Sequence, residues 1–235
     1  MAARAINTLP EWQAGALDQP LALSTTLALD LPTPRVGFRL AAYTLPSGRD
    51  TMRVQGFDSQ PTLSGNTLKL EPLTEGDLEG LYQAAGDPGI WRDHPASDRW
   101  KRHVFEEYFA SLLATKTALA VIDIHSGLIV GTSSYYTPPD RPDSIAIGFT
   151  FLVREKWGGS SNHELKQLML EHAFKTFDTV FFHIAASNIR SQKATLKIGA
   201  VHLYDADLNL SASLRPWKCY GLTRTQWAQG SECPR

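Results

Sequence analysis

A glycine-rich stretch in the middle of the chain has the composition of an anion-binding loop. Apolar residues at helical spacing follow it directly. Its members are Trp157, Gly158, Gly159, Ser160, Ser161 and Asn162. The first N–H groups of a helix lack intrahelical partners, the helix dipole favours negative charge there, and glycine lets a phosphate approach the backbone. The stretch could therefore hold a pyrophosphate, although a plain strand-to-helix turn would use the same glycines to solve a backbone problem.

A polar pair, Asn188 and Ser191, follows a nearly continuous apolar run at 179–186. Such a run is typical of an interior strand that is buried on both faces. Asparagine is a favoured N-cap, which predicts that Asn188 opens a helix with Ser191 in its first turn. Both side chains would then follow a central strand, at a place where a ligand could enter and contact them.

The elements before the glycine-rich stretch are predicted to be a strand, two helices and a strand meander. Residues 67–73 alternate like a strand, and Thr74 begins a capping-box pattern that opens the first helix. Ser97 or Asp98 can cap the second helix, in which Trp100 begins a run of apolar residues with a period near 3.6. Three strand-like runs then follow in quick succession, at 118–124, 128–136 and 144–153. Their close spacing indicates antiparallel pairing.

The elements after the stretch complete a mixed α/β order. Residues 165–177 carry apolar side chains at helical spacing, and His172 within them is predicted to pack against the core. The run at 179–186 is the expected central strand, and Gly199 is expected to end the helix that Asn188 opens. The last two strand candidates lie at 200–204 and 216–222. This order predicts an α/β fold, a central mixed sheet flanked by helices, with one helical crossover between two interior strands.

The pattern of apolar residues becomes regular near residue 60, where we expect a domain boundary. Residues 1–60 form an N-terminal extension in which 35–43 and 51–57 alternate like the strands of a hairpin. The extension is too apolar for a disordered tail, so we expect it to complete the functional site or a homodimer contact. The main domain is expected at 61–225, and a C-terminal tail at 226–235.

Composition and charge exclude several classes of protein. With 23 Lys and Arg against 24 Asp and Glu, the formal net charge is −1, and no global field attracts nucleic acid or an anionic membrane. No apolar run approaches the ~20 residues of a membrane span, so we expect a soluble, cytoplasmic protein with a small ligand. Cys219 and Cys233 lack the spacing of metal ligands, so neither a zinc site nor a disulfide framework is expected.

The main domain carries four motifs in order, at 63–73, 147–174, 188–191 and 197–200. The second contains Ile-Gly-Phe, the glycine-rich stretch and its helix; the third reads Asn-x-x-Ser and the fourth Lys-Ile-Gly-Ala. Together they resemble one branch of the GNAT superfamily, that of the ribosomal-protein N-terminal acetyltransferases of the RimJ and RimL type. The likeness covers roughly residues 62–222. It implies the GNAT acyl-CoA N-acyltransferase fold for the main domain.

The resemblance implies an N-acetyltransferase that moves the acetyl group of acetyl-CoA to a primary amine by direct attack. In the family this cosubstrate contacts the glycine-rich stretch and the helix turn that here carries Asn188 and Ser191. It also contacts the backbone of the fourth strand of the family fold, which here comprises Phe151, Leu152 and Val153. Ser191 would protonate the departing thiolate. No metal is expected to take part.

The resemblance also points to an acceptor side. The loop before the second helix lines the acceptor pocket in the family, which makes Trp91 a pocket wall and His94 a candidate general base. His183, Asp93, Asp143 and bulk water are the alternatives, although a histidine in an apolar strand is more often a core residue. The acceptor would be a small-molecule amine or a peptide N-terminus.

The chain departs from the family pattern at two positions. Ser160 stands where the family usually has a second glycine, and Ala146 stands where it often has a glutamate that relays a proton from the amine. These departures keep open a second hypothesis, a catalytically weak or inactive GNAT-fold module that binds acyl-CoA. A third hypothesis is a structural partner protein that uses residues 1–60 as an interaction arm.

Overall fold

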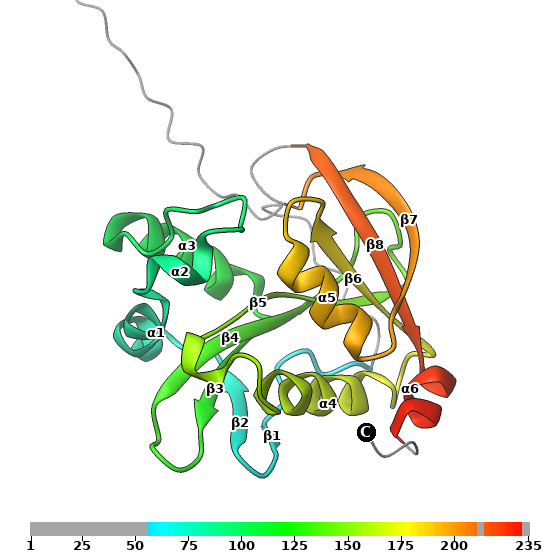
Figure 1. Cartoon of the computed structure of the whole chain (residues 1–235). Helices are drawn as coiled ribbons and strands as arrows, with labels where there is room; N and C mark the ends of the chain where they lie inside the picture. The colour runs from blue at the N-terminus through cyan, green and yellow to red at the C-terminus, as the bar shows by residue number, and fades with distance from the viewer. Residues whose placement is uncertain (1–55, 211–213, 232–235) are drawn as a thin grey trace, which may run out of the picture. The chain divides into compact units, whose positions relative to one another are not determined.

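The computed structural model describes residues 56–210 and 214–231 of the chain (Figure 1). All of the described residues belong to one compact unit. Nearly all of the hairpin expected in the N-terminal extension therefore lies outside the described residues.

In the described part of the chain, eight strands form one mixed sheet in the order β1-β2-β3-β4-β5-β6-β8-β7. The strands are β1 (Leu63–Ser64), β2 (Leu68–Pro72), β3 (Ala118–Asp123), β4 (Ile129–Tyr136), β5 (Ile145–Leu152), β6 (Thr179–Ala185), β7 (Val201–Leu208) and β8 (Arg215–Thr223). Every neighbouring pair is antiparallel except β5 and β6, which run parallel. The predicted mixed sheet is confirmed.

The predicted meander is also confirmed. Strands β3, β4 and β5 are consecutive antiparallel neighbours, and each begins and ends within one residue of its expected bounds. Gly127, at a φ of +70°, forms the tight turn between β3 and β4, in a backbone region where glycine meets no steric penalty. The strand-like runs of the sequence therefore located these strands correctly.

Six α-helices in the described residues flank the sheet (Figure 1). They are α1 (Leu78–Ala85), α2 (Pro88–Trp91), α3 (Arg102–Thr115), α4 (Ser161–Ala173), α5 (Ile189–Lys197) and α6 (Arg224–Ser231). Helix α4 is the expected crossover, because it connects the two parallel strands β5 and β6. None of these six helices has both the length and the apolar surface that crossing a bilayer requires.

The two faces of the sheet are covered by different helices, and β3 shows how its side chains divide between them. Leu119 and Val121 point into the core that contains the apolar face of α4. Ala118 and Ala120 point into the opposite core, which contains the apolar faces of α1 and α3. Because successive side chains alternate across a strand, a strand buried on both faces reads as a continuous apolar run.

The predicted start of the second helix is wrong. Helix α3 begins at Arg102, and neither Ser97 nor Asp98 caps it. Lys101, the residue before the helix, has an extended backbone with ψ of 132°, which separates residues 97–100 from the helix. Trp100 consequently lies outside α3 and is 37% exposed. The segment before α3 is instead a loop that lines the pocket described below.

Two features at the ends of the main domain differ from a simple extension and tail. Phe57 is buried in the main core, three residues ahead of the boundary expected at 60, and contacts Tyr135 and Phe177. At the C-terminal end of the main domain, helix α6 follows strand β8 directly. The Thr223 N–H donates to Gln226 Oε1 and the Gln226 N–H donates to Thr223 Oγ1, which is a capping box at the start of α6.

Candidate active site

The pocket forms where β5 and β6 separate. The two strands pair at only two positions, Ile145 with Val180 and Ala146 with Phe181. Beyond Ala146, β5 continues to Leu152 without pairing to β6, and a pocket of about 650 Å³ opens beside it. The pocket is therefore set by the topology of the sheet, at the carboxyl ends of two parallel strands.

The open edge of β5 offers backbone hydrogen-bonding groups to a ligand. Val153 N–H donates to Val130 O on β4 at 2.9 Å, so it is not available to a ligand, and Val153 does not line the pocket. Because successive residues of a strand point their N–H groups to opposite edges, Leu152 directs its own toward the pocket. The Leu152 carbonyl confirms this orientation, since it accepts a hydrogen bond from Trp157 Nε1 at 2.9 Å.

A bulge lies on the same strand. The pairing of β4 with β5 shifts register between Thr132 and Ser134, opposite Gly148–Phe151. Phe149 has a φ of +52°, a left-handed conformation that is rare outside glycine and asparagine. Such backbone strain is found mostly where a site needs a particular geometry, and here it re-aims the pocket-lining backbone of β5.

The glycine-rich stretch lies at the N-terminus of α4, as predicted. Gly158 has a φ of +73°, so the backbone itself requires glycine there. Gly159 has no such constraint, and a Cβ added to either glycine would meet no atom within 4 Å. Open space in front of both residues, which line the pocket, agrees with a site that a ligand approaches.

Two serines of the stretch lie outside the pocket lining. The lining runs through Gly158 and Gly159 and then along one face of α4, through Asn162 and Lys166. Ser160 is exposed and Ser161 is off that face. The departure from the family pattern at Ser160 therefore falls beside the pocket and not in it.

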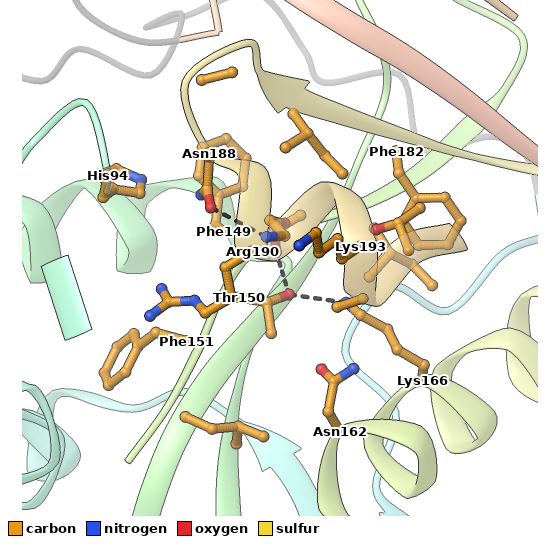
Figure 2. Close-up of a pocket in the computed structure, with 18 of the residues that line it drawn as sticks. His94, Phe149, Thr150, Phe151, Asn162, Lys166, Phe182, Asn188, Arg190 and Lys193 are labelled. Atoms are coloured by element: carbon orange, nitrogen blue, oxygen red, sulfur yellow. Dashed lines mark hydrogen bonds between the residues drawn. The ribbon is translucent and has the colours of Figure 1, made fainter. Parts of the chain in front are cut away.

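Asn188 caps helix α5, which confirms its predicted structural role. Its side-chain oxygen accepts a hydrogen bond from the Ser191 N–H at 3.1 Å. Gly199, at a φ of +91°, follows the end of α5 as expected. Asn188 lines the pocket next to the end of β6 (Figure 2). Ser191 lines the same pocket. The structure thus brings the two polar motifs of the sequence to one cavity.

Arg190 links three walls of the pocket and was not singled out from the sequence. Its guanidinium stacks over the Trp157 ring at 3.9 Å and donates to Ile90 O at 3.0 Å. Burial lowers the pKa of Arg190, but an arginine keeps its charge at any physiological pH. The only sequence signal was its place in the first turn of a helix that follows a buried strand.

The loop between α2 and α3 forms the other end of the pocket. Trp91 is buried, packs on Phe151 with ring centroids 5.0 Å apart, and donates from Nε1 to Ala85 O. Arg99 is also buried and stacks over the Tyr108 ring at 3.7 Å. Trp91 is therefore both a core residue and a pocket wall, and Arg99 brings a cation to this end.

His94 lines the same end, and its hydrogen bonding limits what it can do. Its Nδ1 accepts from the Ala96 N–H at 2.9 Å. Burial, with Arg99 as the next contribution, lowers the pKa of His94 well below its usual value, so the ring is neutral at pH 7. A neutral ring that accepts at Nδ1 carries its proton on Nε2. His94 thus presents a donor to the pocket, which disfavours its expected role as general base.

The other base candidates are either held by a neighbouring side chain or lie outside the pocket. His183, on the interior strand β6, places Nδ1 at 2.8 Å from the Tyr136 hydroxyl. Asp93 and Asp143 are exposed and do not line the pocket. His172, predicted to pack, contacts the Phe57 ring and lies outside the pocket.

Lys166 is a pocket residue to which the sequence analysis gave no role. It lies on the buried face of α4, and its Nζ donates to Thr150 Oγ1 on β5 at 2.9 Å (Figure 2). Burial lowers the pKa of Lys166 to about 7. Its spacing from Met169, Leu170 and Ala173 was the available signal, because it places this lysine on the apolar stripe of the helix.

The pocket lining is cationic. Five of its residues are lysine or arginine: Arg99, Lys166, Arg190, Lys193 and Lys197. No aspartate or glutamate is among the lining residues that the structure describes. Lys193 and Lys197 lie on α5, and Arg99 lies near His94. The field inside the pocket therefore favours anionic ligands.

Comparisons with known proteins agree with this geometry. Residues 67–201, more than half of the chain, match the model of the acetyltransferase (GNAT) domain family. A comparison with curated proteins returned no match. Among solved structures, a GCN5-related N-acetyltransferase from Brucella melitensis has a TM-score of 0.62 and 16% identity, over 74% of this chain and 83% of that one.

Two further structures share the fold. A GNAT-family protein from Chromobacterium violaceum has a TM-score of 0.63 and 17% identity, over 90% of this chain and all of that one (100%). RimJ from Mycobacterium smegmatis, solved in complex with CoA-disulfide, has a TM-score of 0.53 and 14% identity, over 71% of this chain and 87% of that one.

The chain belongs to the GNAT acetyltransferase family. It is therefore an acyltransferase, an enzyme that transfers acetyl groups, and its main domain has the fold of that family. The resemblance drawn from the four sequence motifs is confirmed.

Proposed function

We propose that the protein transfers the acetyl group of acetyl-CoA to a primary amine by direct attack of the amine on the thioester. The observation that carries the proposal is the open edge of β5, which faces a pocket bounded by a glycine-rich helix N-terminus. A long, flexible ligand with amides and phosphates fits this arrangement. The strand edge can pair with its amides, and the helix N-terminus can hold its pyrophosphate.

The pocket suggests how acetyl-CoA would lie. We place the pyrophosphate against Gly158, Gly159 and Asn162, where the open space and the dipole of α4 coincide. The pantetheine arm would run along β5 and pair with the Leu152 N–H. Lys193 on α5 would then be a cation near the phosphates (Figure 2). This placement puts the thioester toward the end of the pocket that holds His94.

The transfer step needs few protein groups. A neutral amine attacks the thioester carbonyl, the carbon–sulfur bond breaks, and the thiolate takes a proton. Ser191 remains the candidate donor, because it lines the pocket on the first turn of α5 and Asn188 holds that turn in place. The acceptor nitrogen loses its proton to solvent at the pocket mouth, since no carboxylate lines the described pocket.

The charge of the pocket narrows the acceptor class. A simple cationic amine would be repelled by the arginines and lysines of a lining that has no acidic side chain. An amine that carries its own carboxylate or other anionic group would be held by Arg99 and by the His94 Nε2–H, while its nitrogen faces the thioester. We therefore propose an α-amino acid or a similar amine with a nearby anion as the acceptor.

Acetyl-CoA-dependent thiol release, measured with a panel of paired amines, tests both parts of this proposal. Each pair consists of an amino acid and the amine left after removal of its carboxylate, so that size and side chain match. We expect turnover with the amino acid and at least tenfold lower kcat/KM with its partner, about 1.4 kcal/mol. Turnover of the plain amines alone would overturn the acceptor class but not acetyl transfer. No thermal shift with millimolar acetyl-CoA would overturn the cosubstrate assignment.

A further inference from the structure

A second group of polar side chains lies where β6 pairs with β8, and one member of the group, His183, also lines the pocket. His183 on β6 stands directly opposite Cys219 on β8, and Asp140 lies in the loop between β4 and β5. Each of the three offers one ligand atom, and these atoms all lie within 4.8 Å of one another. We propose that Asp140, His183 and Cys219 bind a divalent metal ion of the zinc class through Oδ1, Nε2 and Sγ.

The His183 ring is oriented toward a ligand. Its side chain is fully buried, at 0% exposure, and its Nε2 has no hydrogen-bond partner among the described residues. Asp140 Oδ1, at 3.6 Å from Nε2, is too distant for a hydrogen bond. A buried polar atom without a partner is rare and costly, so such an atom beside a carboxylate and a thiol supports an ion-binding role.

Two tyrosines hold the proposed ligands in orientation. The Tyr136 hydroxyl lies 2.8 Å from His183 Nδ1, which leaves Nε2 as the nitrogen that faces Asp140 and Cys219. The Tyr204 hydroxyl donates to Asp140 Oδ2 at 2.6 Å, which leaves Oδ1 facing His183. Hydrogen bonds of this kind fix the tautomer and rotation of metal-binding side chains in known sites.

The donor set and charges suit a zinc-class ion. One nitrogen, one oxygen and one sulfur make three protein ligands, and a water molecule can complete a tetrahedron. An ion would bind the thiolate form of Cys219, so the thiol must give up its proton. Ion binding would form the metal–sulfur bond and release that proton. Thiolate and carboxylate then balance the two positive charges, while the nearby cation Arg141 donates to the Tyr204 hydroxyl.

Sheet register explains why cysteine spacing did not predict this site. The three residues are distant in sequence and share no short motif, whereas cross-strand pairing places Cys219 opposite His183 on one side and Tyr204 on the other. An ion there would tie the β4–β5 loop to β6 and β8. It would also fix His183 and Tyr136, both of which line the acetyl-transfer pocket.

Cobalt binding to the untagged full-length chain tests the proposal. After treatment with a chelator, the reduced protein is titrated with Co²⁺, whose tetrahedral sites absorb in the visible and whose thiolate bonds absorb in the near ultraviolet. We expect both absorptions to saturate at one equivalent and to disappear when Zn²⁺ is added. Cys219→Ser should abolish the thiolate absorption and weaken binding at least about tenfold. Cys233→Ser, which alters the other cysteine of the chain, is the matched control and should change neither.

Asp140→Asn keeps the test valid if the buried variant fails to fold. Asp140 lies on a loop with its side chain 21% exposed, so the substitution should leave the circular dichroism and melting temperature of the metal-free protein unchanged. It should weaken Co²⁺ binding at least about tenfold. Absence of thiolate absorption at tenfold excess Co²⁺, or its persistence in Cys219→Ser, would overturn the site. The readout does not involve acetyl-CoA, so it stands apart from the proposed function.

Discussion

Hydrogen bonds already formed inside the pocket decide which side chains can act on a substrate. The Ala96 N–H donates a hydrogen bond to Nδ1 of His94, and the Ser191 N–H donates one to the Asn188 side-chain oxygen. Each contact removes one possible role and leaves another. His94 becomes a donor, and Asn188 becomes a support for the turn that presents Ser191.

The donor role of His94 can be separated from a base role by two substitutions. The amide of His94→Gln can still donate a hydrogen bond, whereas His94→Ala cannot. We expect kcat/KM for the acceptor to fall about 10- to 100-fold in the alanine variant, the size of a lost bond to a charged group, and clearly less in glutamine. Steady-state kinetics between pH 6 and 9 measure this. Equal losses in both variants would favour the base role instead.

The proposed role of Ser191 as proton donor is tested by whether kcat or KM changes when the serine is replaced. If its hydroxyl protonates the thiolate only in the transition state, Ser191→Ala should lower kcat with little change in KM for acetyl-CoA. Asn188→Ala is the structural counterpart, and we expect it to lower the free energy of unfolding by about 1 kcal/mol as a lost cap. Urea denaturation of both variants, beside their kinetics, distinguishes the roles. Unchanged kcat in Ser191→Ala would remove this serine from the reaction.

Helix α4 contributes both its N-terminus and its buried face to the site, and the two glycines just before it allow a matched pair of tests. Gly158→Ala forces a side chain into a left-handed conformation and should lower stability by about 1 kcal/mol. Gly159→Ala has no such strain, so stability should stay within about 0.5 kcal/mol while its new methyl group enters the ligand space. Calorimetric titration should then show weaker acetyl-CoA binding for Gly159→Ala. Unchanged affinity would place the pyrophosphate elsewhere.

The buried face of α4 gives the stability of the protein a pH dependence through Lys166. Burial holds the pKa of this amine at about 7 in the folded chain, against an ordinary value of 10.5. Between these values the unfolded chain binds more protons, so the free energy of unfolding should rise with pH from about 7 upward. Below pH 7 both states are protonated and this rise is absent. Urea denaturation of the wild type and Lys166→Met at pH 7.5 and 9.5, above the titration range of the histidines, should show the steeper rise in the wild type, and equal slopes would contradict the shift.

Regular elements could be located from the sequence because their signals are local. The strands of the meander and β6 agree with alternation and apolar runs to within about a residue, and the Asn188 cap is a short-range pattern. The start of α3 was wrong because Arg99, which follows a good capping residue, is buried in the pocket instead of continuing a helix. Tertiary contact overrode local preference there.

Pocket side chains were harder to find because their partners are distant in sequence. Arg190 meets the Ile90 carbonyl, a hundred residues earlier in the chain, and Lys166 meets Thr150 across two elements. The glycine-rich stretch was found because the N-terminus of every helix has unpaired N–H groups that favour an anion, whatever the rest of the fold. Which strand N–H faces the pocket follows from register alone, so Leu152 could not be separated from Val153 beforehand.

At the scale of the whole molecule, the compact core reaches back before the expected boundary at residue 60. The Phe57 ring packs against the rings of Tyr135 and Phe177, with centroid distances of 5.1 and 5.2 Å. Phe57→Ala should therefore lower the free energy of unfolding by about 3 kcal/mol, as for a buried aromatic residue. Urea denaturation measures this, and a chain that starts at residue 56 is the control that keeps the ring. A loss below about 1 kcal/mol would show that the core does not depend on Phe57.

The separation of β5 from β6 gives the protein an unpaired strand edge in the middle of its sheet and not at its border. Exposed edges invite pairing with strands of other chains, which leads to aggregation. Here the free edge lies inside a pocket, beside Trp157 and the first turn of α5, where a slender molecule can reach it more easily than a strand that carries side chains on both faces. The fold thus keeps backbone groups that can form hydrogen bonds, without the usual risk of self-association. The ligand takes the place of the absent neighbouring strand.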